Sequence, residues 1–104
     1  MNVFLDDVRE PPEGWVRVGW PEDVIALLKS GQVRELSLDH DLGDDGHGTG
    51  YTVLLWLETQ VGLHGLVPPK IHIHSANPPA RLRMVAAIEA ITRLARLTEG
   101  QLPG

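Results

Sequence analysis

Short apolar runs alternate with longer amphipathic stretches along this chain. The short runs are three or four residues long and predict strands, whereas the stretches carry apolar residues at helical spacing and predict helices. The predicted strands cover residues 3–5, 15–18, 36–38 and 71–74, and the predicted helices cover about residues 21–30, 51–61 and 79–97. Strands that alternate with helices predict an α/β fold with a parallel sheet.

Two segments leave alternatives open. Only residues 7–14, with Pro11 and Pro12 among them, join the first two strands. A parallel crossover usually needs a dozen or more residues. The segment is therefore either an irregular loop between parallel strands, which we expect, or a connection to an antiparallel strand. The helix at 51–61 is apolar on more than one side, which predicts deep burial or contact with a partner.

Composition narrows the class of protein. The 104 residues predict one domain, 1–104, and the net charge of −5, from 9 basic and 14 acidic residues, disfavours strong nucleic-acid binding. The absence of cysteine excludes thiolate metal sites and a cysteine nucleophile. No apolar run is long enough to span a membrane and the first residues do not resemble a signal peptide, so we expect a cytoplasmic protein. Five aromatic residues are too few to predict a stacking platform for single-stranded nucleic acid.

Carboxylates follow two of the predicted strands. Asp6 and Asp7 come after the first strand, and Asp39 comes after the third. Ligands of open parallel sheets bind at the carboxyl ends of the strands. Clustered carboxylates repel one another and need a cation or raised pKa values. Oxygen ligands suit magnesium or manganese, so these three aspartates are predicted metal ligands, although single aspartates at strand ends also cap helices or close turns.

Histidines lie beside these carboxylates. His40 and His74 are candidate general acid and base for a phosphoester, and Asp41, next to His40, is the third candidate catalytic residue. A lone histidine is more often a satisfied polar group, and His72, predicted to face away from its isoleucine neighbours, fits that description.

Three further polar residues are candidates for binding a phosphate. Arg9 either reaches a phosphate or neutralises its acidic neighbours. Ser75 and Asn77 are placed to donate hydrogen bonds to a phosphoryl oxygen, but Asn77 is equally suited to cap the last helix.

Three motifs, in order, resemble a known family. They are Leu5-Asp6-Asp7-Val8-Arg9, Leu38-Asp39-His40-Asp41-Leu42-Gly43 and His74-Ser75-Ala76-Asn77-Pro78. They are similar to receiver domains of response regulators. In that family, acids at the positions of Asp6, Asp7 and Asp39 hold magnesium. The acid at the position of Asp39 also accepts the phosphoryl group, and the residue at the position of Ser75 contacts that group. The lysine of the fifth receiver strand and the first receiver helix have no counterpart here. The motifs resemble more specifically the cyclic-phosphate processing receiver-like domains.

This resemblance implies a fold and a function. The fold is a small flavodoxin-like, three-layer receiver fold, with a mostly parallel sheet of order 2-1-3-4, about three helices and no fifth strand. The function is metal-dependent hydrolysis, with Mg or Mn, of a cyclic phosphate of a nucleotide or RNA end. The alternative is a non-catalytic module that binds a phosphorylated small molecule or a protein partner. The expected partner is a phosphorylated or cyclic nucleotide, and a homodimer is left open.

Overall fold

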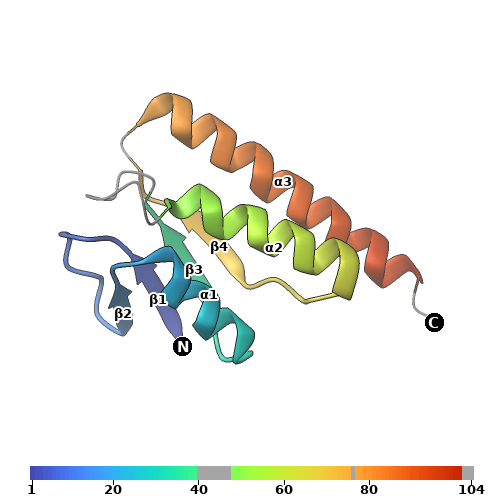
Figure 1. The fold of residues 1–104 in the computed structure, drawn as a ribbon, viewed down its shortest axis with the longest axis horizontal. Coiled ribbons are helices and arrows are strands. Elements are labelled where there is room, and N and C mark those ends of the chain that lie inside the picture. Colours follow the sequence, from blue (N-terminus) through green and yellow to red (C-terminus); the bar gives the residue numbers. More distant parts are fainter. Residues whose placement is uncertain (40–47, 76, 102–104) are drawn as a thin grey trace.

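The protein forms a parallel sheet with helices packed against it (Figure 1). The computed structural model describes residues 1–39, 48–75 and 77–101. The elements in chain order are β1 (Asn2–Leu5), β2 (Trp15–Val18), α1 (Pro21–Lys29), β3 (Glu35–Leu38), α2 (Gly50–His64), β4 (Lys70–Ile73) and α3 (Pro78–Gln101). The strand order is β2-β1-β3-β4 and every pair is parallel. The predicted sheet is confirmed, and so is the irregular loop between the first two strands.

One side of the sheet forms the core. The register places Val3 beside Leu36 and Leu5 beside Leu38, and all four side chains are inaccessible to solvent. The two isoleucines of β4 pair with the same positions of β3 and pack against this cluster. Because side chains alternate between the faces of a strand, these positions define one apolar face.

The helices cover this apolar face. Helix α2 lies between α1 and α3 and packs against both (Figure 1). Four of its residues, Val53, Leu54, Leu57 and Val61, are fully buried. Burial between two helices and the sheet therefore explains why α2 is apolar on more than one side. No helix in the described ranges is both long and apolar enough to cross a membrane.

The expected third layer is not present in the described part of the chain. The chain leaves β1 for β2 and then returns past β1 to β3, so its first crossover runs in the direction opposite to the later ones. Because crossovers are right-handed, the connection from β1 to β2 lies on the face of the sheet opposite the later connections. Pro12 of this connection lies there, beside Phe4 and Ser37. The segment is too short and too rich in proline to form a helix, so the described chain has two layers.

We call the side of the sheet opposite the helices the open face. The register assigns to it Asn2, Phe4, Trp15, Arg17, Glu35, Ser37, Lys70 and His72. The predicted orientation of His72 is confirmed, since its side chain is 43% exposed on this face. The open face mixes aromatic, charged and hydroxyl side chains, so it is not a second hydrophobic core.

Candidate functional site

Three polar residues follow the carboxyl ends of three adjacent strands. Asp6, Asp39 and His74 come directly after β1, β3 and β4. The backbone N–H of each donates a hydrogen bond of 3.0–3.1 Å to a neighbouring strand, so the ladder continues for one residue. Strand alternation therefore directs their side chains to the open face. The strand order reverses between β1 and β3, which is where open parallel sheets bind ligands.

Asp6 is held by the turn that follows β1. It is 1% exposed, and its Oδ1 accepts hydrogen bonds of 2.9 Å from the N–H groups of Val8 and Arg9. Its Oδ2 lies 3.1 Å from Nε2 of His74. Burial raises the pKa of Asp6, but the two backbone donors and His74 outweigh it, and the pKa lies below the ordinary 3.8. Asp6 is therefore a fixed anion at neutral pH.

The imidazole of His74 is fixed through both nitrogens and one face. Its Nε2 faces Asp6, and its Nδ1 lies 2.7 Å from the hydroxyl oxygen of Ser37. The ring stacks on Phe4 with centroids 4.1 Å apart and an angle of 5° between planes. Burial lowers the pKa of His74 below the ordinary 6.5, against the opposing effect of Asp6 and Asp39. The neutral ring, with one N–H and one lone pair, is thereby favoured.

Asp39 lies at the junction between β3 and the segment that leads to α2. Its side chain is nearly buried, and its carbonyl accepts a hydrogen bond of 3.1 Å from the N–H of Gly50. A Cβ at position 50 would collide with that carbonyl oxygen, so the close approach requires glycine. A capping box between Thr49 and Thr52 closes the start of α2. The beginning of α2 therefore determines the position of Asp39.

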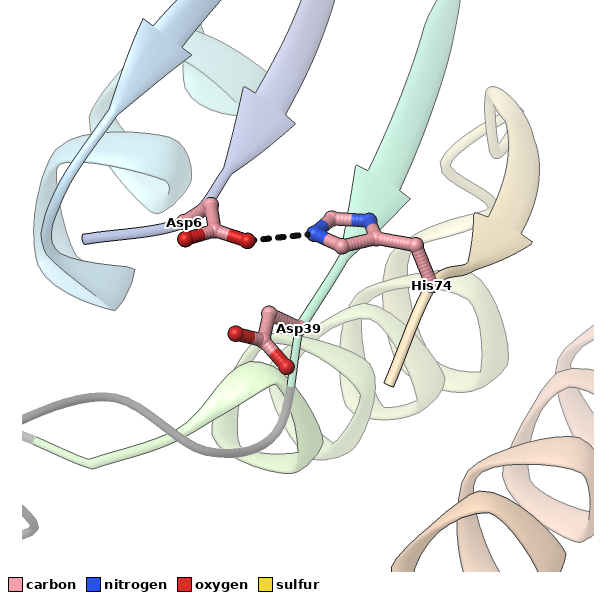
Figure 2. Close-up of side chains that lie close together, drawn as sticks. All are labelled: Asp6, Asp39 and His74. Atoms are coloured by element: carbon pink, nitrogen blue, oxygen red, sulfur yellow. Dashed lines mark hydrogen bonds and ion pairs between the residues drawn. The ribbon is translucent and has the colours of Figure 1, made fainter. Parts of the chain in front are cut away.

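Asp6, Asp39 and His74 have the geometry of a metal-binding group. Figure 2 shows the three side chains at the ends of their strands, with the Asp6 carboxylate directed at the His74 ring. Each offers one ligand atom, and these atoms all lie within 4.8 Å of one another. Adjacent ligands of an octahedral ion, at about 2.1 Å from it, lie about 3.0 Å apart. The 3.1 Å between Asp6 and His74 matches that spacing, so this group of residues could hold a divalent ion.

Arg9 lies beside this cluster. One of its guanidinium nitrogens donates a hydrogen bond of 3.2 Å to the carbonyl oxygen of His74. This contact links the loop after β1 to the end of β4 and uses one of the five N–H groups of a guanidinium. The only described partner of the Arg9 side chain is thus a carbonyl rather than an acidic neighbour.

Ser75 and Asn77 build the turn into α3. Ser75 is buried, and its hydroxyl accepts a hydrogen bond of 3.2 Å from the N–H of Asn77. Oδ1 of Asn77 accepts one of 3.1 Å from the N–H of Ala80, as a helix cap does. The capping role considered for Asn77 is thus present, and phosphate binding by these two residues stays a prediction.

The remaining predicted site residues, Asp7, His40 and Asp41, are not among the three residues of the described cluster. Asp7 is exposed and is not one of the three residues that gather at the strand ends. Its carbonyl oxygen accepts a hydrogen bond of 3.4 Å from Arg17. His40 and Asp41 lie outside the described residues. The predicted roles of these three residues stay predictions.

The sequence analysis did not identify three residues that shape the site. Ser37 and Phe4 position the ring of His74, and Gly50 allows α2 to begin against Asp39. Ser37 could have been identified from the sequence, because a hydroxyl residue between two leucines of a buried strand indicates a polar contact. The role of Phe4 depends on which face it occupies, and that becomes clear only from the register.

The sheet order and the acidic residues at its carboxyl edge define a receiver-like α/β domain. A family profile described as the cyclic-phosphate processing receiver domain matches residues 1–90. The chain belongs to this family, and the resemblance seen in the three motifs is confirmed. No curated protein and no solved structure matched the chain.

Addition of a divalent ion is expected to raise the melting temperature. An ion that binds only the folded chain stabilises it by mass action, by about 1.4 kcal/mol at ten times its dissociation constant. Thermal melting with and without millimolar Mn²⁺ measures the shift. Asp6→Asn should remove the shift, whereas Asp23→Asn, at an exposed aspartate of α1, should keep it. An unchanged melting temperature in the wild type would contradict the metal site.

Proposed function

We propose that this protein is a metal-dependent phosphoesterase that hydrolyses a cyclic phosphate of a nucleotide or RNA end. The observation that carries the proposal is the convergence of Asp6, Asp39 and His74, with ligand atoms within 4.8 Å at the strand-order reversal. Two buried carboxylates at this spacing are unfavourable without a cation. Membership of a family described by cyclic-phosphate processing supports the class of substrate.

Each residue of the cluster has a role in this proposal. Asp6, Asp39 and His74 hold the ion, which when bound supplies Lewis-acid stabilisation of phosphoryl oxygens. Asp6 stays in place because two backbone N–H groups bind its Oδ1. Arg9, hydrogen-bonded to the end of β4, presents further guanidinium donors to a phosphoryl oxygen.

The contacts of His74 support a ligand role over proton transfer. A histidine that binds a metal through one nitrogen usually has its other nitrogen paired with a neighbouring polar group. Ser37 is such a partner for Nδ1, and Nε2 faces the carboxylates. Proton transfer is then assigned to His40 and Asp41.

The donor set also bears on the ion. Carboxylates suit Mg²⁺ and Mn²⁺, whereas imidazole suits transition metals. One imidazole with two carboxylates therefore favours Mn²⁺ over Mg²⁺ as the more active ion.

The test is hydrolysis of adenosine 2′,3′-cyclic phosphate by the purified protein, followed by chromatography. Turnover is expected with Mn²⁺, with a smaller rate in Mg²⁺ and none after chelation. Saturable binding of the nucleotide without turnover in either ion would instead support the non-catalytic binding module. Turnover that chelation leaves unchanged would contradict the role of the ion.

A further inference from the structure

The open face carries a pocket directly below the candidate site. The pocket has a volume of about 220 Å³ and is lined by Phe4, Pro12, Trp15, Ser37 and His72. Phe4 and Ser37 come from the two central strands and are buried, whereas Trp15 and His72 come from the two outer strands. The rings of Trp15 and His72 meet edge to face, with centroids 6.3 Å apart. The pocket is therefore an aromatic recess in an otherwise polar surface.

The pocket adjoins the Asp6, Asp39 and His74 cluster through two of its lining residues, Phe4 and Ser37. Phe4 stacks on the ring of His74, and the hydroxyl of Ser37 is hydrogen-bonded to the same ring. Phe4, Ser37 and His72 each precede one residue of the cluster by two positions on the same strand. Two residues along a strand span roughly 6.7 Å. If the phosphate of a ligand lies at the cluster, a group joined to that phosphate through one sugar therefore reaches the pocket.

We propose that this pocket holds the nucleobase of a mononucleoside cyclic phosphate whose phosphate lies at the cluster. The inference rests on the proposed function for the position of the phosphate. Aromatic side chains bind the flat face of a base. Nε2 of His72 lies 3.2 Å from a carboxylate oxygen of Glu35, so the hydroxyl of Ser37 and Nδ1 of His72 are the atoms that offer hydrogen bonds to the edge of the base. A recess of about 220 Å³ has room for one base. The net charge of −5 also disfavours a bound RNA chain over a single nucleotide.

The experiment compares a nucleoside cyclic phosphate with a cyclic phosphate that carries no nucleoside. The substrates are adenosine 2′,3′-cyclic phosphate and ethylene phosphate, a five-membered cyclic phosphate without sugar or base. The quantity compared is the ratio of kcat/KM for the adenosine compound to kcat/KM for ethylene phosphate. Loss of base stacking in Trp15→Ala is expected to lower this ratio by about 5- to 150-fold. Trp15→Leu keeps apolar bulk for folding and should lower the ratio as well. Trp20→Ala, at an exposed tryptophan that does not line the pocket, should keep it.

Three results would overturn the inference. The first is a ratio that falls equally in the Trp15 and Trp20 variants or in neither. The second is a kcat/KM for a dinucleotide ending in the same cyclic phosphate that equals or exceeds that of the mononucleotide. The third is a dimer, seen by sedimentation, that Trp15→Leu dissociates without changing the ratio, since that outcome assigns the open face to a second copy of the chain.

Failure of the proposed function gives a different result. If the wild type hydrolyses neither substrate, a titration with adenosine 2′,3′-cyclic phosphate followed by NMR decides the inference alone. A shift confined to the indole N–H signal of Trp15 would support the base pocket in a binding protein. An unmoved Trp15 signal would overturn the pocket together with the proposed function.

Discussion

Asp39→Asn is expected to abolish hydrolysis of adenosine 2′,3′-cyclic phosphate while the protein stays folded. The amide keeps the shape of the carboxylate but removes the charge that holds the ion. A bound ion contributes several kcal/mol to the transition state, so the loss in kcat is about 1,000-fold or more. The melting temperature without metal should stay the same or rise, because the repulsion between Asp39 and Asp6 is relieved. Turnover assays and thermal melting on one preparation measure both effects.

Asp23→Asn provides the matched control for this change. It makes the same chemical substitution at an exposed aspartate in the first turn of α1, away from the strand ends. Its turnover should equal that of the wild type. An Asp39→Asn protein that is folded and fully active would contradict the metal-binding role, and one that is unfolded would make Asp39 a structural residue.

His74→Gln is expected to lower kcat by about 100-fold or more. A loss of this size is expected if His74 transfers a proton, and we expect at least as much if it holds the ion. The two roles differ in their response to metal. Loss of a ligand should remove the Mn²⁺-induced rise in melting temperature, and added Mn²⁺ should recover part of the rate. Loss of a proton-transfer group should keep the rise and remove one limb of the pH profile.

His64→Gln is the control, since His64 is an exposed histidine in the last turn of α2. It should leave both turnover and the metal-induced shift unchanged. Retention of the metal-induced shift in His74→Gln would contradict the ligand role proposed above.

The same His74 variant has a pH readout in metal-free buffer. The pKa of His74 is lower in the folded chain than the ordinary 6.5, so the unfolded chain binds more protons below neutral pH. The free energy of unfolding therefore falls as the pH decreases from about 7 through 6.5. The lowered pKa of Asp6 acts in the same direction, near and below 3.8. His74→Gln should remove the upper part of this pH dependence, and an unchanged curve would show that other groups cause it.

Local patterns were sufficient for the elements and for the residues at the strand ends. β2 has the predicted limits, and the other strands differ from the prediction by one residue at one or both ends. Alternation along such short strands depends on neighbouring residues alone. Asp6, Asp39 and His74 were also identified, because the carboxyl ends of parallel strands meet at one edge.

The arrangement around each side chain was not predictable in the same way. Asp6 and Asp7 are adjacent and chemically alike, yet Asp6 is buried in the cluster and Asp7 is exposed. The difference arises because the ladder continues through Asp6, whereas Asp7 lies in the turn that the Asp6 carboxylate closes on the N–H groups of Val8 and Arg9. The pairing of His74 with Ser37 joins residues 37 positions apart and depends on the register of β3 and β4.

The sequence alone thus determines the order of strands and helices and the acidic and histidine residues at the strand ends, since both depend on interactions between near neighbours in the chain. Only the tertiary structure decides that the described helices share one face and that the other face stays open. That outcome depends on the direction of each crossover, which no local pattern records. Trp15 and Phe4 acquire their place beside His72 and His74 for the same reason, because strands distant in sequence bring them together.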